Sequence, residues 1–491
     1  MLHNGIFWSL LASFFVVLSY TMQQRGNIKL SLCCILLCGF CLRIFMFSDS
    51  FLHEWDERYH FLVAKNLQND WLKPILYPDV PLHYAYQNWT ANYIWMHKPP
   101  FTLWCIMLSF KCFGVSEFSG RIPSLIFSLF CIFLTYKIAL HLFKNHTVAL
   151  LSAFFHSING LVLDMASGRA ASEHIDTTLF FIVELAVYLI LLFEQKKKWY
   201  LIVFIGVLTG LAVLTKWYVG LIIVPLFWIY NISFDKKYSV TLLSFVIFAI
   251  AIVVFHPWQY YIKAHFLQEA AWESQYNIRH IFEAIEGHGH EWWYHLDKAR
   301  IVWNEAIYIV FIWFLLQFYN DFFNKKNLLL AVWVAIPYFI FSCTATKMPG
   351  YVLFTAPVFF MLLAAFIVFC KENQAQHKFL KYVPIIIVAL SIRYAVERVK
   401  PLRNDIVFSS KKQKILDYEK QLGNGKYVVF NTQNSIETMF YTSNLAYEKM
   451  PNQEDIALLK EKNYSIAIID DGNLPDFIKN NELVKKLPFI K

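Results

Sequence analysis

The sequence has few charged residues, and this scarcity excludes an ordinary soluble enzyme. Charged residues make up 16% of the 491 residues, whereas 57% are hydrophobic and 18% are aromatic. The mean hydropathy is +0.42. Soluble domains carry about 25% charged residues. This composition predicts a polytopic α-helical membrane protein.

The sequence also lacks the patterns of a secreted or zinc-finger protein. The nine cysteines form no disulfide framework, and four of them (Cys33, Cys34, Cys38 and Cys41) crowd one apolar run, which argues against a metal-binding pair there. The first apolar run has no basic segment before it and no small-residue cleavage site after it. We therefore expect it to be a retained helix.

The positive charge is arranged as in membrane proteins. The formal charge is +9, but the basic residues stand in short clusters between apolar runs. Clusters such as Lys196-Lys197-Lys198 and Lys325-Lys326 are expected on the cytoplasmic side. This arrangement argues against nucleic-acid binding.

The apolar runs predict the number of membrane spans. A spanning helix needs about 20 apolar residues, and the sequence contains about twelve runs near that length. They are 5–21, 29–47, 122–143, 147–163, 177–193, 199–214, 217–232, 239–255, 301–319, 327–343, 351–370 and 382–398. Phe101–Phe113 is too short to span and is predicted to lie at the interface.

Loop parity predicts which polar segments share a side of the membrane. If alternate loops carry the cytoplasmic lysines, the segments 56–98, 164–176, 256–300 and 347–351, together with Lys216 and everything after residue 400, all lie outside. Every polar feature that suggests chemistry then falls on one face, towards the periplasm.

Two domains are predicted. Residues 1–400 form a transmembrane domain with outer loops 48–121 and 256–300, and residues 401–491 form a small soluble α/β domain outside the membrane. In the second domain, 427–430 and 464–469 are expected to be strands, and 435–441 and 454–462 helices. We expect it to cap the transmembrane domain or to position a ligand there.

Asp56 and Glu57 are the first candidate catalytic residues. They follow an apolar run at the outer interface, where a carboxylate can act as a base or bind a metal. Neighbouring helical residues point about 100° apart, so we assign the reaction to Asp56 and an orienting or metal-binding role to Glu57. The competing interpretation is an interfacial charge pair that reaches water.

The candidate phosphate-binding residues are cations on the outer face. Lys98 precedes Pro99-Pro100, which predicts a helix start beside it. Lys216 and Lys347 lie at outer helix ends, against the positive-inside rule, so each needs an anion. Arg279 and Arg58 are further candidates. A lipid-linked phosphate or a phospholipid headgroup meets this need.

A divalent metal such as zinc is a further hypothesis. Its ligands would be Glu57 or Glu54, His97, and one of His288 or His290. No HExxH spacing supports it.

The order of motifs resembles the GT-C glycosyltransferases that use polyprenyl-phosphate sugars, a family that includes protein O-mannosyltransferases and lipid A aminoarabinose transferases. The matching segments are Asp56-Glu57 with Tyr59, Lys98-Pro99-Pro100, 113–118 with 121–124, 169–176, 211–216, 256–258, 292–294 and 347–351. Departures are Arg58, where the family often has Ala, and His97, where an acid is common.

The resemblance implies an inverting transferase in the cytoplasmic (inner) membrane with a periplasmic site. Asp56 would carry the family's acidic role, Lys98 would contact the donor phosphate, and Asp176, Lys216 and Lys347 would line the cavity. The partners would be a polyprenyl-phosphate sugar and a lipid A-type glycolipid or protein acceptor. The alternatives are a lipid transporter or flippase, and an O-antigen ligase or oligosaccharyltransferase. The identity of the sugar stays open.

Overall fold

The computed structural model describes residues 3–232, 237–402, 406–423 and 425–489. Most helices belong to one bundle: α1 (Gly5–Gln24), α2 (Ile28–Phe47), α5 (Glu117–Phe143), α6 (His146–Ile158), α7 (Gly160–Ala166), α8 (Glu173–Lys196), α9 (Trp199–Lys216), η1 (Trp217–Ile222), α10 (Ile223–Asn231), α11 (Lys237–His265), α13 (Tyr294–Val302), α14 (Ile307–Asn320), α15 (Lys325–Cys343), η3 (Pro349–Thr355), α16 (Ala356–Asn373), η4 (Lys378–Lys381) and α17 (Val383–Val399). Shorter helices lie at one end of it: α3 (Asp56–Asn66), α4 (Pro100–Phe113) and α12 (Leu267–Phe282).

The described chain contains 9 helical stretches long and apolar enough to cross a membrane, or up to 11 if two bent pairs each count as a span. Each predicted apolar run is mainly helical, although the runs 147–163 and 301–319 each bend at a break, so the polytopic fold class is confirmed. The stretch Trp199–Asn231 is broken at Lys216. In α9 and α11, Gly206 faces Ile250 and Gly210 faces Val254, so these helices run parallel. The chain must therefore cross back between them through η1 and α10.

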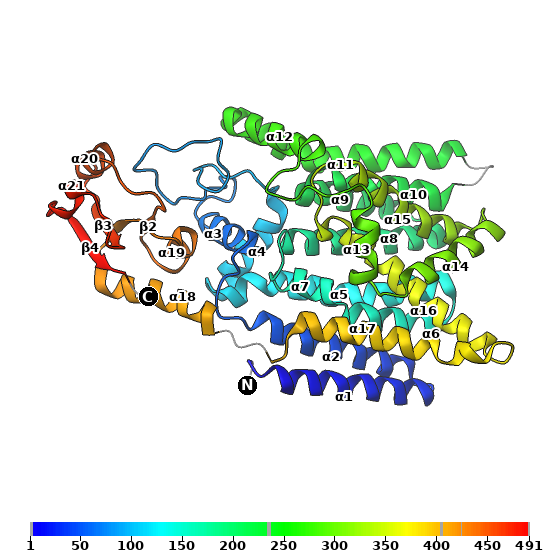
Figure 1. The fold of residues 1–491 in the computed structure, drawn as a ribbon. Helices are drawn as coiled ribbons and strands as arrows, with labels where there is room; N and C mark the ends of the chain where they lie inside the picture. The colour runs from blue at the N-terminus through cyan, green and yellow to red at the C-terminus, as the bar shows by residue number, and fades with distance from the viewer. Residues whose placement is uncertain (1–2, 233–236, 403–405, 424, 490–491) are drawn as a thin grey trace.

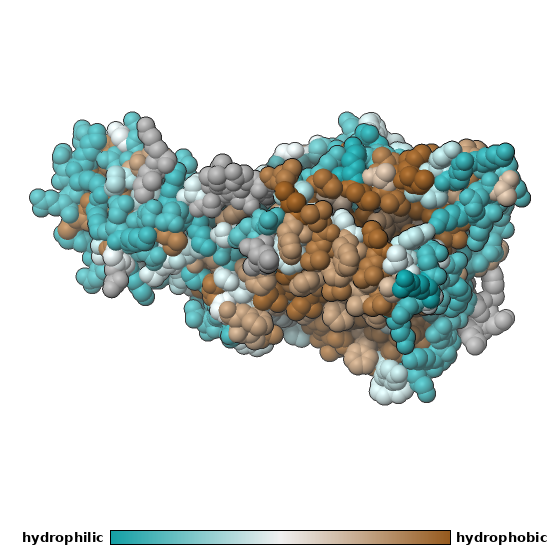
Figure 2. Space-filling model, turned by 90° about the horizontal axis from the view of Figure 1, so that it is seen from below, coloured by the Kyte–Doolittle hydropathy of each residue, from teal (hydrophilic) through white to brown (hydrophobic). Residues whose placement is uncertain are grey.

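The bundle surface matches a membrane environment. Figure 2 shows a broad hydrophobic zone over the bundle, with hydrophilic residues over the C-terminal domain and at the opposite end. Exposed apolar side chains supply such a surface, for example Val253 (73% exposed) on α11 and Leu10 (67% exposed) on α1. Lipid tails can cover these side chains without cost.

A few ionisable residues lie inside the bundle, although the sequence predicts that the polar residues suited to chemistry lie on one face of the membrane. Arg43, His156 and Glu184 are fully buried. Arg43 donates to Ser128 (2.7 Å) and to the carbonyl of Ser157 (3.1 Å). The Thr135 hydroxyl donates to Glu184 (2.5 Å). Such residues in membrane helices are expensive unless they are hydrogen-bonded.

The C-terminal region is an α/β unit at the end of the bundle where α3 and α4 lie (Figure 1). It comprises α18 (Ile406–Leu422), β1 (Tyr427–Phe430), α19 (Ser435–Tyr441), β2 (Leu445–Ala446), α20 (Gln453–Glu461), β3 (Ser465–Asp470), α21 (Asp476–Lys479) and β4 (Val484–Pro488). The sheet order is β2-β1-β3-β4, and all pairs are parallel. The predicted strands and helices of this region are therefore present.

The α/β unit is fixed to the bundle by polar contacts. The Lys65 amine on α3 donates to the carbonyls of Met439 and Phe440, both at 2.8 Å. The Tyr441 hydroxyl donates to Glu117 (2.8 Å) and accepts from the backbone of Leu52 (3.0 Å). These contacts hold the C-terminal sheet beside the start of α3, where the candidate acids lie.

Candidate functional site

Asp56 and Glu57 open helix α3, but they face different surroundings. Both lie in its first turn, where negative charge is stabilised by the helix dipole. Glu57 is fully buried, whereas Asp56 is partly exposed. Asp56 is thus the member of the pair that solvent can reach, and its assignment as the reacting carboxylate stays a prediction.

Both carboxylate oxygens of Glu57 are hydrogen-bonded to buried side chains. Its two carboxylate oxygens accept from Arg121 Nε (2.7 Å) and Nη2 (2.8 Å). One of them lies 2.6 Å from His53 Nδ1, and the other 3.1 Å from His174 Nε2. Burial alone would raise the pKa of Glu57, but Arg121 and His53 hold it well below its usual value. Glu57 is therefore a structural anchor.

Arg121 uses its remaining donors on the segment before α3. Nη1 donates to the carbonyls of Phe47 (3.2 Å) and Asp49 (2.5 Å), and Nη2 donates to the carbonyl of Phe51 (2.7 Å). A guanidinium presents five N–H groups in a rigid plane. One buried arginine thus fixes both the approach to α3 and the acid in its first turn, and so sets the position of Asp56.

Asp56 is held in place by one backbone group and lies within reach of the positive charge of Lys98. Its Oδ2 accepts from the N–H of Ser172 at 2.9 Å. Burial alone would raise the pKa of Asp56, but Lys98, His60 and His97 lower it below the usual value. Asp56 is therefore ionised at neutral pH.

Lys98 is the unoccupied cation of the site. It is half-buried and forms no hydrogen bond or ion pair with any residue that the structure describes. Pro99 and Pro100 start α4 immediately after it, and no side chain caps that helix. An ammonium beside uncapped helical N–H groups is suited to an anion.

Lys216 and Asp176 form an ion pair close to Lys98. The Lys216 amine binds Asp176 Oδ1 and lies 4.6 Å from the centre of the Tyr351 ring. Asp176 Oδ2 is buried and has no hydrogen-bond partner among the described residues. Lys98 lies close enough for its charge to act on both members of the pair. Four predicted site residues, Asp56, Lys98, Asp176 and Lys216, are thus brought together.

Other predicted phosphate ligands are engaged elsewhere. The Lys347 amine is buried and donates to the carbonyls of His290 (2.9 Å) and Thr344. Arg58 pairs with Glu437 of the α/β unit at 3.1 Å. Arg279 pairs with Glu283, and both side chains are about half exposed. These cations brace a loop, a domain contact and a helix surface, respectively.

The structure does not bring the predicted metal ligands together. No group of three or more side chains suited to a metal occurs in the described ranges. Both carboxylate oxygens of Glu57 accept hydrogen bonds from Arg121. His97 contacts Glu273 (3.1 Å), and its ring stacks on Trp89 with 4.3 Å between the ring centres. His288 accepts a hydrogen bond from Lys347 through its backbone carbonyl. These residues do not fit a zinc site, and no step below uses one.

Sequence reasoning missed the buried partners of the site. Arg121 and His174 hold Glu57, and Glu173 lies 2.7 Å from His60 inside the protein. Burial lowers the pKa of His60 to about 4, although Asp56 raises it in part. An arginine directly before the apolar run 122–143 was the available signal for Arg121. No local sequence pattern predicts that His174 contacts Glu57 or that His60 contacts Glu173.

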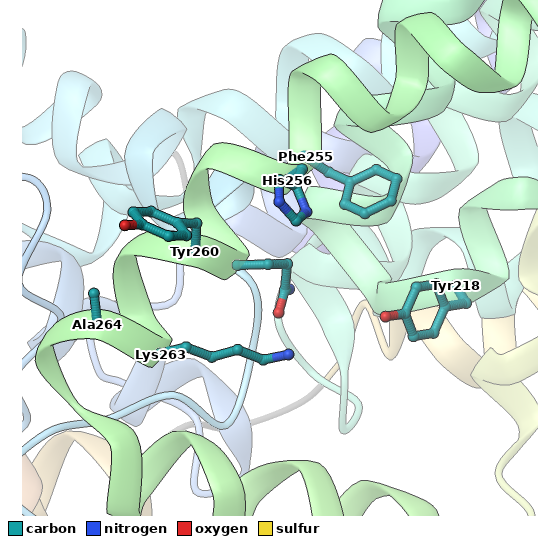
Figure 3. A pocket seen from close by; sticks show the side chains of 7 residues that line it. Tyr218, Phe255, His256, Tyr260, Lys263 and Ala264 are labelled. Carbon is teal, nitrogen blue, oxygen red and sulfur yellow. The ribbon is translucent and has the colours of Figure 1, made fainter.

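A hollow lies along the C-terminal part of α11. It has a volume of about 350 Å³ and is lined by Tyr218, Phe255, His256, Gln259, Tyr260, Lys263 and Ala264. Figure 3 shows the Lys263 amine and the Tyr218 hydroxyl directed towards one another across it. We call this cavity the α11 hollow. Its lining residue Tyr218 is only two positions after Lys216 in the sequence, so a short stretch of chain connects the hollow to the ion pair.

The sequence matches a known family over its middle third. The family model described as dolichyl-phosphate-mannose-protein mannosyltransferase matches residues 97–261. That segment includes Lys98, Asp176 and Lys216. An undecaprenyl phosphate-α-4-amino-4-deoxy-L-arabinose arabinosyl transferase of Pseudomonas fluorescens is 22% identical over 284 residues, which cover 54% of this chain and 48% of that protein. The match spans about half the length of the curated relatives.

Solved structures share the fold. ArnT from Cupriavidus metallidurans, bound to undecaprenyl phosphate, superposes with a TM-score of 0.63 at 14% identity, covering 87% of each chain. The archaeal oligosaccharyltransferase AglB from Archaeoglobus fulgidus, in complex with an inhibitory peptide and a dolichol-phosphate, gives 0.56 at 12% identity, covering 84% of this chain and 64% of that one. The resemblance found in the sequence is confirmed.

Proposed function

This chain has the fold of the GT-C membrane glycosyltransferases and is similar to aminoarabinose and protein mannosyl transferases, and from that premise we propose that it transfers a sugar from a polyprenyl phosphate to a glycolipid or protein acceptor. The reaction takes place at the end of the bundle that carries Asp56 and Lys98. We assign this end to the outer, periplasmic face of the cytoplasmic membrane, because the lysine-rich loops lie at the other end.

One observation carries the proposal. Lys98 is half-buried and forms no hydrogen bond or ion pair with any described residue, although its charge and that of the ionised Asp56 act on one another. A partly buried ammonium whose N–H groups have no acceptor is costly. A donor phosphate supplies that acceptor, while Asp56 faces the reacting carbon on the other side.

The residues suit a single displacement. The acceptor oxygen bonds to the anomeric carbon while the bond from that carbon to the phosphate oxygen breaks. The electron pair leaves with the polyprenyl phosphate, and a hydroxyl acceptor passes its proton to Asp56. Lys98 and Lys216 stabilise the charge that grows on the phosphate. Attack opposite the leaving group inverts the sugar.

Asp176 and the α11 hollow complete this assignment. Lys216 is fixed by Asp176 Oδ1, which leaves the buried Oδ2 to accept from a sugar hydroxyl. The α11 hollow lies where a lipid reaches Lys216 from the bilayer, and Lys263 in it has no partner among the described residues. We therefore assign the donor's approach to that side.

The transporter alternative is less consistent with the interior. A transport path needs ionisable groups that face water or a substrate cavity. Arg43, His156 and Glu184 are instead sealed, each at 0% exposure. The charges of the candidate site, Asp56, Lys98, Asp176 and Lys216, lie together at one end, as expected for an enzyme that works on a substrate delivered by the membrane.

The test is transfer from radiolabelled polyprenyl-phosphate sugars to total membrane lipids and proteins. Lys98→Ala should lower kcat roughly 10²–10³-fold, as expected for one lost electrostatic contact. Asp56→Asn should lower it roughly 10²–10⁴-fold. Lys263→Ala should raise the donor KM and leave kcat close to normal.

Arg279→Ala is the matched control, since its exposed cation pairs with Glu283 away from the acids. Full transfer by Asp56→Asn would remove the role given to that acid. Movement of label across the bilayer without transfer would establish transport instead.

A further inference from the structure

A second hollow lies between the α/β unit and the start of α3. Its volume is about 490 Å³, within the range of about 300–1,000 Å³ typical of small-molecule sites. One wall is Glu54, Trp55 and Arg58, next to Asp56, and the other walls are α18 and the loops that follow β1 and β3. We call it the interdomain hollow.

The topology of the sheet places this hollow where parallel sheets bind ligands. In the sheet, β2 lies on one side of β1, and β3 lies on the other side. The chain therefore leaves β1 in one direction and leaves β2 in the opposite direction, across β1, to reach β3. The loops after β1 and β3 therefore diverge at the carboxyl ends of these strands, which creates a crevice at this switch point. Asn431, in the left-handed region at φ 59°, donates to the carbonyl of Ile469 at 2.9 Å and ties the two loops together.

The lining offers polar groups that the protein itself does not use. The side chains of Gln433, Asn434 and Lys414 form no hydrogen bond with any described residue. Arg58 Nε is buried and also lacks an acceptor among them. Asn434 and Lys414 are half-buried, whereas Gln433 is exposed at the rim of the hollow. Buried or half-buried polar groups without partners are costly unless a ligand or water binds them.

The charges in the hollow are nearly balanced, which indicates an uncharged ligand. Arg58 pairs with Glu437, and Lys411 pairs with Glu54. The other charged lining residues, Lys414 and Asp471, have opposite signs. Trp55 adds a flat apolar surface that is 61% exposed. Amides, one amine and an exposed indole are suited to a ligand with many hydroxyl groups and an apolar ring face.

We propose that the interdomain hollow binds a saccharide unit of the acceptor, an assignment that rests on the proposed function. Trp55 lines the hollow and Asp56 follows it directly in the chain. A glycan held by Gln433, Asn434 and Trp55 therefore presents its neighbouring unit to Asp56. The Arg58–Glu437 pair bridges the two walls and keeps them at a fixed separation.

A peptide acceptor fits this hollow less well. Extended peptides commonly bind by pairing with an exposed edge strand. The hollow instead lies at the ends of β1 and β3, the two central strands of the sheet.

The test is calorimetric titration of the full-length protein in detergent with maltose, cellobiose, N,N′-diacetylchitobiose and a neutral tetrapeptide. We expect at least one disaccharide to bind, and the Gln433→Ala/Asn434→Ala double variant to weaken its binding about tenfold, as expected for one or two lost hydrogen bonds. Trp55→Ala should weaken binding further. Gln453→Ala, an exposed glutamine of α20 outside the hollow, is the matched control and should bind as the wild type does.

Failure of this inference is distinguishable from failure of the proposed function. The titration needs neither donor nor transfer, so saccharide binding that is lost in the double variant supports the site even if no transfer is found. With transfer established, the double variant should raise the acceptor KM about tenfold, with little change in kcat. No disaccharide binding, binding unchanged in the double variant, or binding of the tetrapeptide alone would each overturn the assignment.

Discussion

Replacing Glu57 with glutamine tests whether this acid anchors the site. The substitution keeps the shape of the side chain but removes the charge that faces Arg121. Both side chains have 0% exposure, and two hydrogen bonds of 2.7 and 2.8 Å join them. Glutamine would turn an NH₂ group towards the guanidinium and leave a buried cation without its counter-charge. Breaking such a pair costs about 3–5 kcal/mol, and we expect the free energy of unfolding to fall by that amount.

The measurement is denaturant-induced unfolding of each variant in detergent micelles. Glu283→Gln is the control, since it makes the same substitution against another arginine, Arg279. That pair is exposed, with 53% and 52% of its side chains accessible. Water screens exposed ion pairs, so the control should unfold as the wild type does. Asp56→Asn should also keep its stability, because asparagine can still accept from the N–H of Ser172.

The reasoning is refuted if Glu57→Gln and Glu283→Gln unfold at the same denaturant concentration. It is also refuted if Glu57→Gln is as stable as the wild type but lacks all transfer activity, because Glu57 would then act in the reaction. A large loss of stability with residual transfer per folded molecule supports the anchoring role.

Two further predictions concern pH and the domain contact. Burial lowers the pKa of His60 to about 4, so between pH 6.5 and 4 the unfolded chain takes up a proton that the folded protein does not. The contribution of His60 to the free energy of unfolding should therefore fall by about 3 kcal/mol as the pH drops through that window. The difference in stability between the wild type and His60→Asn, measured by unfolding at each pH, should change by that amount. Tyr441→Phe removes the hydroxyl that joins Glu117 to the backbone of Leu52. The loss should cost about 1–3 kcal/mol and should speed proteolytic release of the α/β unit, whereas Tyr238→Phe, at an exposed position, should not.

The sequence by itself determined the elements of this protein. Spans need about 20 apolar residues, and this requirement is local to the chain. The twelve predicted runs between residues 5 and 398 are therefore mainly helical in the structure, with breaks inside two of them. The strands Tyr427–Phe430 and Ser465–Asp470 followed from short apolar runs between polar turns. Loop parity also placed Asp56, Lys98 and Lys216 on one face, because a helix that spans fixes the side on which its ends lie.

The tertiary structure alone decided which of those residues act together. Residues 40 positions apart, Asp176 and Lys216, meet because α8 and α9 are antiparallel neighbours. Three predicted phosphate ligands, Arg58, Lys347 and Arg279, turned out to have protein partners of their own. Which cation is left without an anion depends on long-range packing of every nearby acid and carbonyl. Local patterns contain no record of that packing, and so only the folded chain shows that Lys98, unlike the other three cations, has no protein partner among the described residues.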